Sequence, residues 1–190
     1  MIVEGLLTTV DSAGKINVAP MGPIVSDDFQ KLLLRPFQPS TSFTNLSETR
    51  VGVFHVVDRV DIIARAAIGQ LTNLPPVVAA NTVTGYVLQD CCRWFELEVD
   101  SVDATEARSL IPSTVVFTGE RRPFFGFNRA RHAVLEAAII ATRIHLLDWT
   151  TINQAFEFLA PAVSKTGGPI EKDSFEMLRE YVQTRRDASS

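Results

Sequence analysis

The amino-acid sequence predicts an α+β protein in which an antiparallel β-barrel comes first and a group of helices follows. Two observations lead to this prediction. Residues 1–125 contain about six short apolar or β-branched segments with brief connections, which is typical of an antiparallel barrel. From residue 126 onward, apolar residues recur at helical spacing instead. We therefore expect two parts, a barrel over residues 1–125 and a helical subdomain over residues 126–190.

The barrel part predicts strands separated by turn residues. The turn at residues 11–15 contains Gly14, which can adopt the backbone angles that a tight turn requires. The segment at 51–57 is rich in β-branched residues and apolar, which favours a buried strand. A short helix is expected at 41–47, and the stretch 71–84 with its paired prolines is expected to be irregular. In chain order, the expected strands cover residues 2–10, 15–19, 31–35, 51–57, 93–99 and 112–119.

The helical part predicts three long helices. Asn128 is a natural N-cap for the first of them, and a Gly-Gly-Pro sequence ends the second. Each helix carries an apolar stripe at helical spacing. One further helix is indicated inside the first part of the chain, at residues 61–68. The three C-terminal helices are expected at residues 128–147, 150–164 and 171–186.

Composition excludes several classes of protein. The 190 residues are 46% hydrophobic and 21% charged, and the formal net charge is −4, so neither a nucleic-acid binder with a basic face nor a disordered chain is expected. No apolar run reaches the ~18 residues of a membrane helix, and the first residues lack a basic stretch followed by an apolar one, so neither a membrane span nor a secretory signal is expected. Cys91 and Cys92 are adjacent and expected to be reduced in a cytoplasmic protein, and the three histidines are too scattered to suggest a metal site.

Candidate phosphate-binding side chains follow an apolar segment near the middle of the barrel part. Arg35 ends the segment, and a run of hydroxyls and one amide comes directly after it. A guanidinium offers a fixed fork of donors, and hydroxyls, amides and backbone N–H groups add neutral ones, which together suit a phosphate. A polar turn whose arginine pairs with a surface carboxylate is the alternative. The proposed phosphate ligands are Arg35, Ser40, Thr41, Ser42, Thr44 and Asn45.

Four motifs in this order give the chain a family resemblance. They are Asn17 to Pro23 (Asn-Val-Ala-Pro-Met-Gly-Pro), Leu34 to Phe37 (Leu-Arg-Pro-Phe), Ser40 to Leu46 (Ser-Thr-Ser-Phe-Thr-Asn-Leu) and Gly52 to His55 (Gly-Val-Phe-His). Together with Phe125 to Ala133, they resemble the DUF447 family, an uncharacterised family of split-barrel proteins that bind flavin mononucleotide (FMN). The resemblance covers nearly the whole chain. It implies a split β-barrel with a C-terminal helical appendage, FMN as the cofactor, and a homodimer that holds FMN at its interface.

Three further residues enter the candidate site through this resemblance. Met21 and Gly22 would line the flavin ring, although a proline-rich turn after a strand needs no ligand. His55 would contact the flavin, although a single histidine in an apolar strand is commonly a hydrogen-bonded core residue. The chain lacks the glycine fingerprint of dinucleotide folds and a Walker loop, so a flavin would have to bind in a barrel mode.

The sequence leaves the activity open. The most concrete hypothesis is an FMN-dependent oxidoreductase that works with a small-molecule substrate or redox partner. No residue is recognisable as a general acid or base, so the catalytic residues are unknown. The alternative is a non-catalytic or accessory protein that binds FMN, a deazaflavin or a pterin-like molecule.

Overall fold

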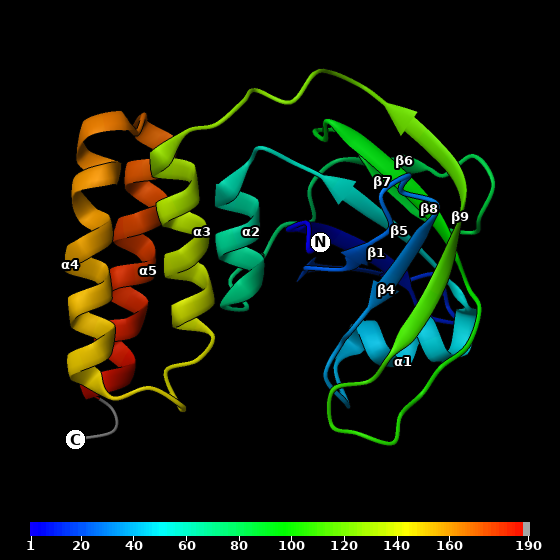
Figure 1. Ribbon diagram of the computed structural model, residues 1–190, viewed down its shortest axis with the longest axis horizontal. Coiled ribbons are helices and arrows are strands. Elements are labelled where there is room, and N and C mark those ends of the chain that lie inside the picture. Colours follow the sequence, from blue (N-terminus) through cyan, green and yellow to red (C-terminus); the bar gives the residue numbers. More distant parts are fainter. Residues whose placement is uncertain (188–190) are drawn as a thin grey trace. The chain divides into compact units, whose positions relative to one another are not determined.

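A computed structural model describes residues 1–187 and divides the chain into two compact units (Figure 1). The first unit contains residues 1–57 and 73–124, and the second contains residues 58–72 together with the chain from residue 125 onward. We expected a division at residue 125 with everything before it in the barrel. The observed units differ because the helix near residue 60 contributes Val60 and Ala64 to the core of the helical unit.

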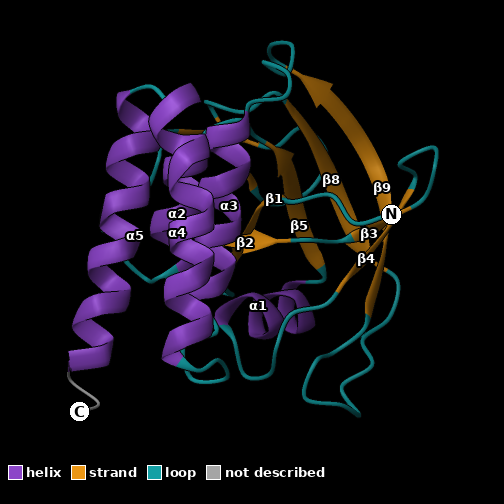
Figure 2. Cartoon of the chain, turned by 60° about the vertical axis from the view of Figure 1, so that its left-hand side comes forward, coloured by secondary structure: helices purple, strands orange, loops and turns teal. Residues whose placement is uncertain are grey.

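The first unit is built on a seven-stranded antiparallel sheet that curls as a split barrel does (Figure 2). Its strand order is β2-β1-β5-β8-β9-β4-β3. The sheet strands are β1 (Gly5–Val10), β2 (Ile16–Met21), β3 (Ile24–Val25), β4 (Lys31–Leu34), β5 (Val51–Val56), β8 (Arg93–Val99) and β9 (Ile111–Glu120). Each expected strand is present, and within this sheet only the short β3 was not anticipated. The split-barrel fold class is therefore confirmed.

Strand register gives the sheet two distinct buried faces. Leu7 of β1 is opposite Phe54 of β5, which is opposite Phe95 of β8, and all three belong to the main core cluster of this unit. The alternate residues Thr8, Val53 and Glu96 are opposite one another on the other face. Because successive side chains of a strand point to opposite faces, one face is apolar and the other mixes apolar and polar groups.

Two elements cover these faces. Helix α1 (Thr41–Thr49) contributes Leu46 to the apolar cluster. A separate hairpin, made of β6 (Val77–Ala79) and β7 (Tyr86–Leu88), contacts β1 and β5. This hairpin lies within the segment that we expected to be irregular. The prediction failed there because the two strands have only three residues each, too few for an alternating pattern to stand out.

The second unit is a bundle of four helices (Figure 1). They are α2 (Val60–Ala67), α3 (Arg129–Ala141), α4 (Trp149–Thr166) and α5 (Pro169–Asp187). Helix α3 packs on the other three, and its buried side is almost entirely alanine, which allows close approach. Asn128 caps α3, as expected, by accepting a hydrogen bond from the N–H of Arg131. Among residues 1–187, no helix is both long enough and apolar enough to cross a bilayer.

One predicted helix is shorter than expected. Helix α3 ends at Ala141, whereas the apolar stripe predicted a helix as far as residue 147. Residues 142–147 form turns instead, and Asp148 then caps α4 by accepting from the N–H of Thr151. The apolar residues Ile144 and Leu147 still pack against the bundle core, which explains why the pattern continued beyond the helix.

We predict that Gly119→Ala destabilises the sheet. Gly119 is opposite Trp94, and a methyl group there would lie 2.1 Å from the indole ring. The ring cannot easily move, because its Nε1 donates to the Glu96 carboxylate at 3.2 Å. Overpacking of this kind costs about 1–3 kcal/mol of unfolding free energy, which denaturant titration measures.

Gly85→Ala is the matched control. A methyl group at Gly85 would meet Val53 at 3.5 Å, an ordinary van der Waals contact. It should therefore have a much smaller effect, and equal destabilisation by the two substitutions would contradict the steric explanation.

Candidate functional site

The N-terminal end of α1 has the properties of an anion site. Ser40 is the N-cap, and its side chain accepts a hydrogen bond from the N–H of Phe43 at 3.3 Å. The N–H of Thr44 bonds the Ser40 carbonyl, whereas the preceding N–H groups of Thr41 and Ser42 have no acceptor within the helix. The first turn contains no acidic residue. The helix dipole and these N–H groups therefore favour an anion at this end.

Arg35 lies between β4 and this helix. Its side chain is half-buried, and the Nε atom is buried without a hydrogen-bond partner. A buried guanidinium N–H is costly to leave unsatisfied, and an oxygen acceptor of a ligand is one group that would satisfy it. The residues present thus fit an anionic ligand, with Arg35 as its cationic contact.

A second arginine is close to the first and was not singled out from the sequence. The Nε of Arg108 donates to the backbone carbonyl of Arg35 at 3.2 Å, and its guanidinium lies 5.2 Å from the ring centroid of Phe37. Phe37 is 60% exposed. Arg108 is far away in the sequence, and only the pairing of the segment around Phe37 with the segment around Arg108 brings the two together. No sequence spacing could have indicated this contact.

The expected phosphate ligands divide into an exposed group and a buried group. Thr41 and Thr44 are exposed on α1 near its N-terminus. Ser42 and Asn45 are buried instead, and the Ser42 hydroxyl and the Asn45 side-chain nitrogen already have partners. The Asn45 amide donates to Thr9 Oγ1 at 3.0 Å, and the Asn17 amide donates to Ser42 Oγ at 3.1 Å. The buried pair therefore fixes α1 on the sheet, and the exposed pair remains available to a ligand.

Met21 and Gly22 lie at the end of β2. Met21 is 9% exposed and belongs to the apolar cluster of the barrel. Gly22 lies beside the Glu4 side chain, and a methyl group added at Gly22 would lie 2.7 Å from a carboxylate oxygen of Glu4, so that exposed side chain would have to move. A flavin contact at these two residues stays a prediction.

His55 is a fully buried residue with two hydrogen bonds. Its Nε2 accepts from the N–H of Leu88 at 3.1 Å, so its Nδ1 carries the proton and donates to the carbonyl of Leu6 at 3.2 Å. Burial lowers the pKa of His55 to about 4; the bond to Leu6 opposes this shift and the charge of Arg121 adds to it. The ring is therefore neutral, and this geometry favours the alternative of a core histidine over a flavin contact.

Glu96 is a second buried polar residue, on the same face of the sheet as His55. Its carboxylate accepts hydrogen bonds from the backbone N–H groups of Asn81, Thr82 and Val83 at 2.8, 2.6 and 3.2 Å. Burial raises the pKa of the Glu96 carboxyl, but these bonds and the one from Trp94 outweigh it and the net shift is downward. In a strand over 93–99, Trp94 and Glu96 lie on one face because successive side chains alternate, but the sequence does not show that their side chains contact the segment around Asn81.

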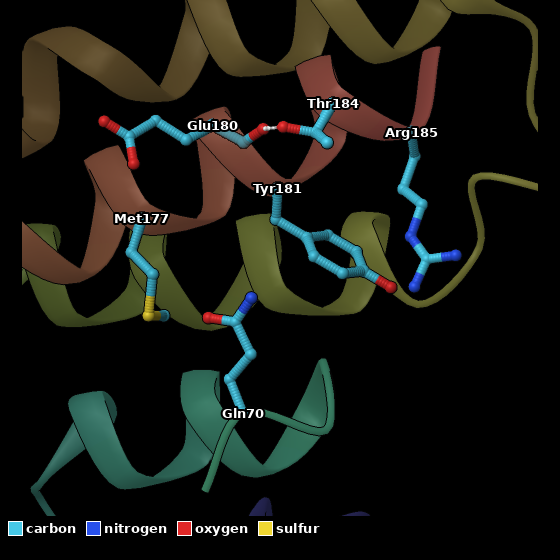
Figure 3. Close-up of a pocket in the computed structure, with 6 residues that line it drawn as sticks. All are labelled: Gln70, Met177, Glu180, Tyr181, Thr184 and Arg185. Carbon is cyan, nitrogen blue, oxygen red and sulfur yellow. Dashed lines mark hydrogen bonds between the residues drawn. The ribbon is translucent and has the colours of Figure 1, made fainter. Parts of the chain in front are cut away.

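A depression in the helical unit has a different character (Figure 3). It lies along α5 near the end of α2, with a volume of about 480 Å³. The Thr184 hydroxyl already has a partner, because its Oγ1 donates to the carbonyl of Glu180 at 2.9 Å. The lining contains no buried polar atom that lacks a partner among the described residues. The full lining is Gln70, Met177, Glu180, Tyr181, Thr184 and Arg185.

Comparison with known families identifies the chain. The family model for the N-terminal domain of DUF447, a protein of unknown function, matches residues 3–121, and the model for the rest of DUF447 matches residues 128–180. The chain belongs to the DUF447 family. The resemblance noted in the sequence is thereby confirmed. No curated protein matches the chain.

Solved structures that are similar to this DUF447 chain include the following three. The FMN-bound DUF447 protein MM1853 from Methanosarcina mazei has a TM-score of 0.81 and 21% identity, over 95% of this chain and 94% of the other. An FMN-binding protein from Thermus thermophilus with bound 1-cyclohex-2-enone has a TM-score of 0.52 and 15% identity, over 62% and 70%. The 2-nitrobenzoate 2-nitroreductase NbaA from Pseudomonas fluorescens has a TM-score of 0.52 and 16% identity, over 62% and 64%. At these identities, the likeness shows the fold.

We predict that His55 makes the stability of the protein depend on pH. Its pKa falls from 6.5 in the unfolded chain to about 4 in the fold, so the unfolded state takes up the proton first on acidification. Stability from this group is fully present above pH 6.5 and is lost as the pH falls toward 4, by about 3 kcal/mol. In denaturant titrations between pH 6.5 and 4.5, His55→Gln should reduce the dependence of the unfolding free energy on pH. This pH range lies above the one in which titration of Glu96 contributes.

His145→Gln is the control, because His145 is exposed in the turns that follow α3, and its substitution should leave this pH dependence unchanged. An NMR titration of the three histidines in the unmodified protein gives a second measurement. A His55 ring that titrates near its ordinary pKa would show that the two backbone bonds are not maintained in solution.

Proposed function

We propose that this chain is a flavoprotein that binds FMN, with the phosphate at the N-terminal end of α1. The observation that carries the proposal is the buried, unpartnered Nε of Arg35, a residue that shortly precedes in the sequence a helix N-terminus without acidic residues. The exposed hydroxyls of Thr41 and Thr44 and the N–H groups of the first turn would add neutral donors. The bound FMN of MM1853, a protein of the same family and fold, supports this choice of ligand.

The size of the anion site favours a mononucleotide. One arginine and a short set of neutral donors suit a single phosphate group, and the chain has no dinucleotide fingerprint. Phe37, which is 60% exposed directly beyond Arg35 and Pro36, and Met21 with Gly22 at the end of β2 are the residues that we propose for the flavin ring. The Arg108 guanidinium lies against the Phe37 ring and would keep the Phe37 side chain in place.

An FMN-dependent oxidoreductase is the activity that we propose. Bound FMN would supply hydride or electron transfer, which needs no acid or base from the protein. The chain would then contribute binding, orientation and exclusion of water. Similarity of fold to the nitroreductase NbaA supports this activity without naming a substrate.

A non-catalytic binding protein for FMN, a deazaflavin or a pterin-like molecule is the second candidate. The protonation state of His55 favours this candidate. His55 is the one candidate residue whose pKa lies near neutrality in an unfolded chain, and in the fold it is buried and uncharged. Reduction of bound flavin by NADH or NADPH with steady turnover would distinguish the oxidoreductase from this alternative.

We also propose a homodimer with FMN at the interface, as the family resemblance implies. Two apolar side chains near the candidate site are unusually exposed for a single chain, namely Phe37 at 60% and Leu110 at 43%. A partner subunit that covers them would also exclude water from the flavin.

We predict that Arg35→Ala weakens FMN binding by about ten- to a hundredfold. A hydrogen bond to a charged group is worth roughly 1.5–3 kcal/mol, which corresponds to this range of dissociation constants. The fold should be retained, since Arg35 follows β4 and is outside the core cluster. Titration of the apo-protein with FMN, followed by flavin fluorescence, gives the two dissociation constants.

Arg65→Ala is the matched control, because it removes one positive charge from an exposed position on α2 in the other unit. It should leave FMN affinity unchanged. Equal affinity in Arg35→Ala and the unmodified protein would move the phosphate site elsewhere, and failure of the unmodified protein to bind FMN would overturn the proposal itself.

We further predict that FMN shifts the monomer–dimer equilibrium toward the dimer. A ligand that binds only the dimer stabilises it by RT ln(1 + [L]/Kd), about 2.7 kcal/mol at a hundredfold excess over Kd. Sedimentation of the apo-protein with and without FMN measures this shift. A monomer that retains flavin at low protein concentration would show that one chain builds the whole site.

A further inference from the structure

An apolar groove runs along the exposed side of α3 and α4. Its volume is about 560 Å³, and it lies entirely within the helical unit. Phe158 on its rim is 83% exposed, and Phe127, whose ring meets His132 edge-on at 5.9 Å, is 95% exposed. Two exposed phenylalanines beside one groove are unusual for a surface that faces only water. The lining residues are Arg129, His132, Ala133, Glu136, Phe158, Leu159, Pro161 and Ala162.

The charges of this groove have a symmetric arrangement. Arg129, His132, Ala133 and Glu136 follow the i, i+3, i+4, i+7 pattern and therefore form one stripe of α3. The midpoint between Arg129 and Glu136 is also the midpoint between His132 and Ala133. If a second α3 crosses the first in antiparallel orientation at that point, each Arg129 is opposite the other Glu136.

Neither end of the stripe is neutralised within the described part of the chain. Over residues 1–187, no ion pair joins Arg129 or Glu136 to another side chain, although both are exposed. A surface that carries one cation and one anion at equal distances from its centre is complementary to itself. Two-fold symmetric contacts require this property, because residue i must meet residue j and residue j must meet residue i.

We propose that the α3–α4 groove is a self-association surface that binds the same groove of a second copy of this chain. Arg129 of each copy pairs with Glu136 of the other, and Phe158 and Phe127 fill the apolar space beside the pairs. Phenylalanine buries about 150–250 Å². Four of them would provide much of the ~1,000 Å² that a stable interface needs. The surface lies on the helical unit and does not depend on flavin binding.

Charge exchange tests the pairing in the full-length protein. Arg129→Glu places like charges opposite Glu136 in both pairs, and Glu136→Arg does the same opposite Arg129. Each single substitution should raise the dissociation constant of self-association roughly tenfold or more, measured by sedimentation velocity over a range of concentrations. The double substitution Arg129→Glu with Glu136→Arg should restore it, which a change in folding or net charge alone would not do. Single variants that associate as the unmodified chain does, or a double variant as weak as the singles, would overturn the proposal.

Cross-linking tests the position of the two-fold axis. His132 lies next to that axis, so the thiol introduced by His132→Cys should form a disulfide between two copies under mild oxidation. Glu176→Cys, exposed on α5, is the control and should not cross-link, and the native Cys91 and Cys92 are buried. Absence of the cross-link at position 132 would overturn the antiparallel arrangement. Because both tests are made without flavin, their failure and the failure of FMN binding are separate results.

Discussion

The arrangement of the barrel unit depends on two adjacent threonines in β1. Thr8 and Thr9 are each only 2% exposed, and their side chains point to opposite faces of the sheet. The Thr8 hydroxyl donates to the carbonyl of Tyr86 in the β6–β7 hairpin, whereas the Thr9 hydroxyl accepts from Asn45 in α1 at 3.0 Å. Because a buried hydroxyl without a partner is costly, each threonine fixes the element that covers its face. The positions of the hairpin and of α1 thus both follow from one strand.

The candidate anion site is a consequence of the second of these attachments. Asn45 and Ser42 face the sheet, so the helical spacing turns Thr41 and Thr44 outward. The helix is therefore held by one side and presents donors from the other. The opposite directions of these side chains explain why polar residues in one short segment have different roles, and why only the exposed ones are suited to a ligand.

Most strands and helices were predictable from the sequence because their patterns are long and local. The β6–β7 hairpin and the membership of α2 in the helical unit were not. The hairpin depends on a hydrogen bond that Thr8 donates and on bonds that His55 and Glu96 accept, and the position of α2 depends on packing with α3 and α5. In the candidate site, Arg35 was singled out from its position after an apolar segment, and its role stays a prediction. Ser42 and Asn45 could have been recognised as inward-facing from the spacing they share with Leu46, whereas Arg108 could not have been found without the fold.

The buried polar atoms that lack a hydrogen bond are informative because other buried polar groups of the protein have partners. His55 and Glu96 are fully buried, and their ring nitrogens and carboxylate oxygens have partners. Three buried side-chain atoms in the described residues lack a hydrogen bond, those of Arg35, Ser47 and Arg131. That of Arg131 lies 3.6 Å from the Asp58 carboxylate, and a serine hydroxyl is far cheaper to leave unpaired than a cation. Arg35 is the one whose missing partner would be an anion, and for this reason we propose the site there and not at the histidine.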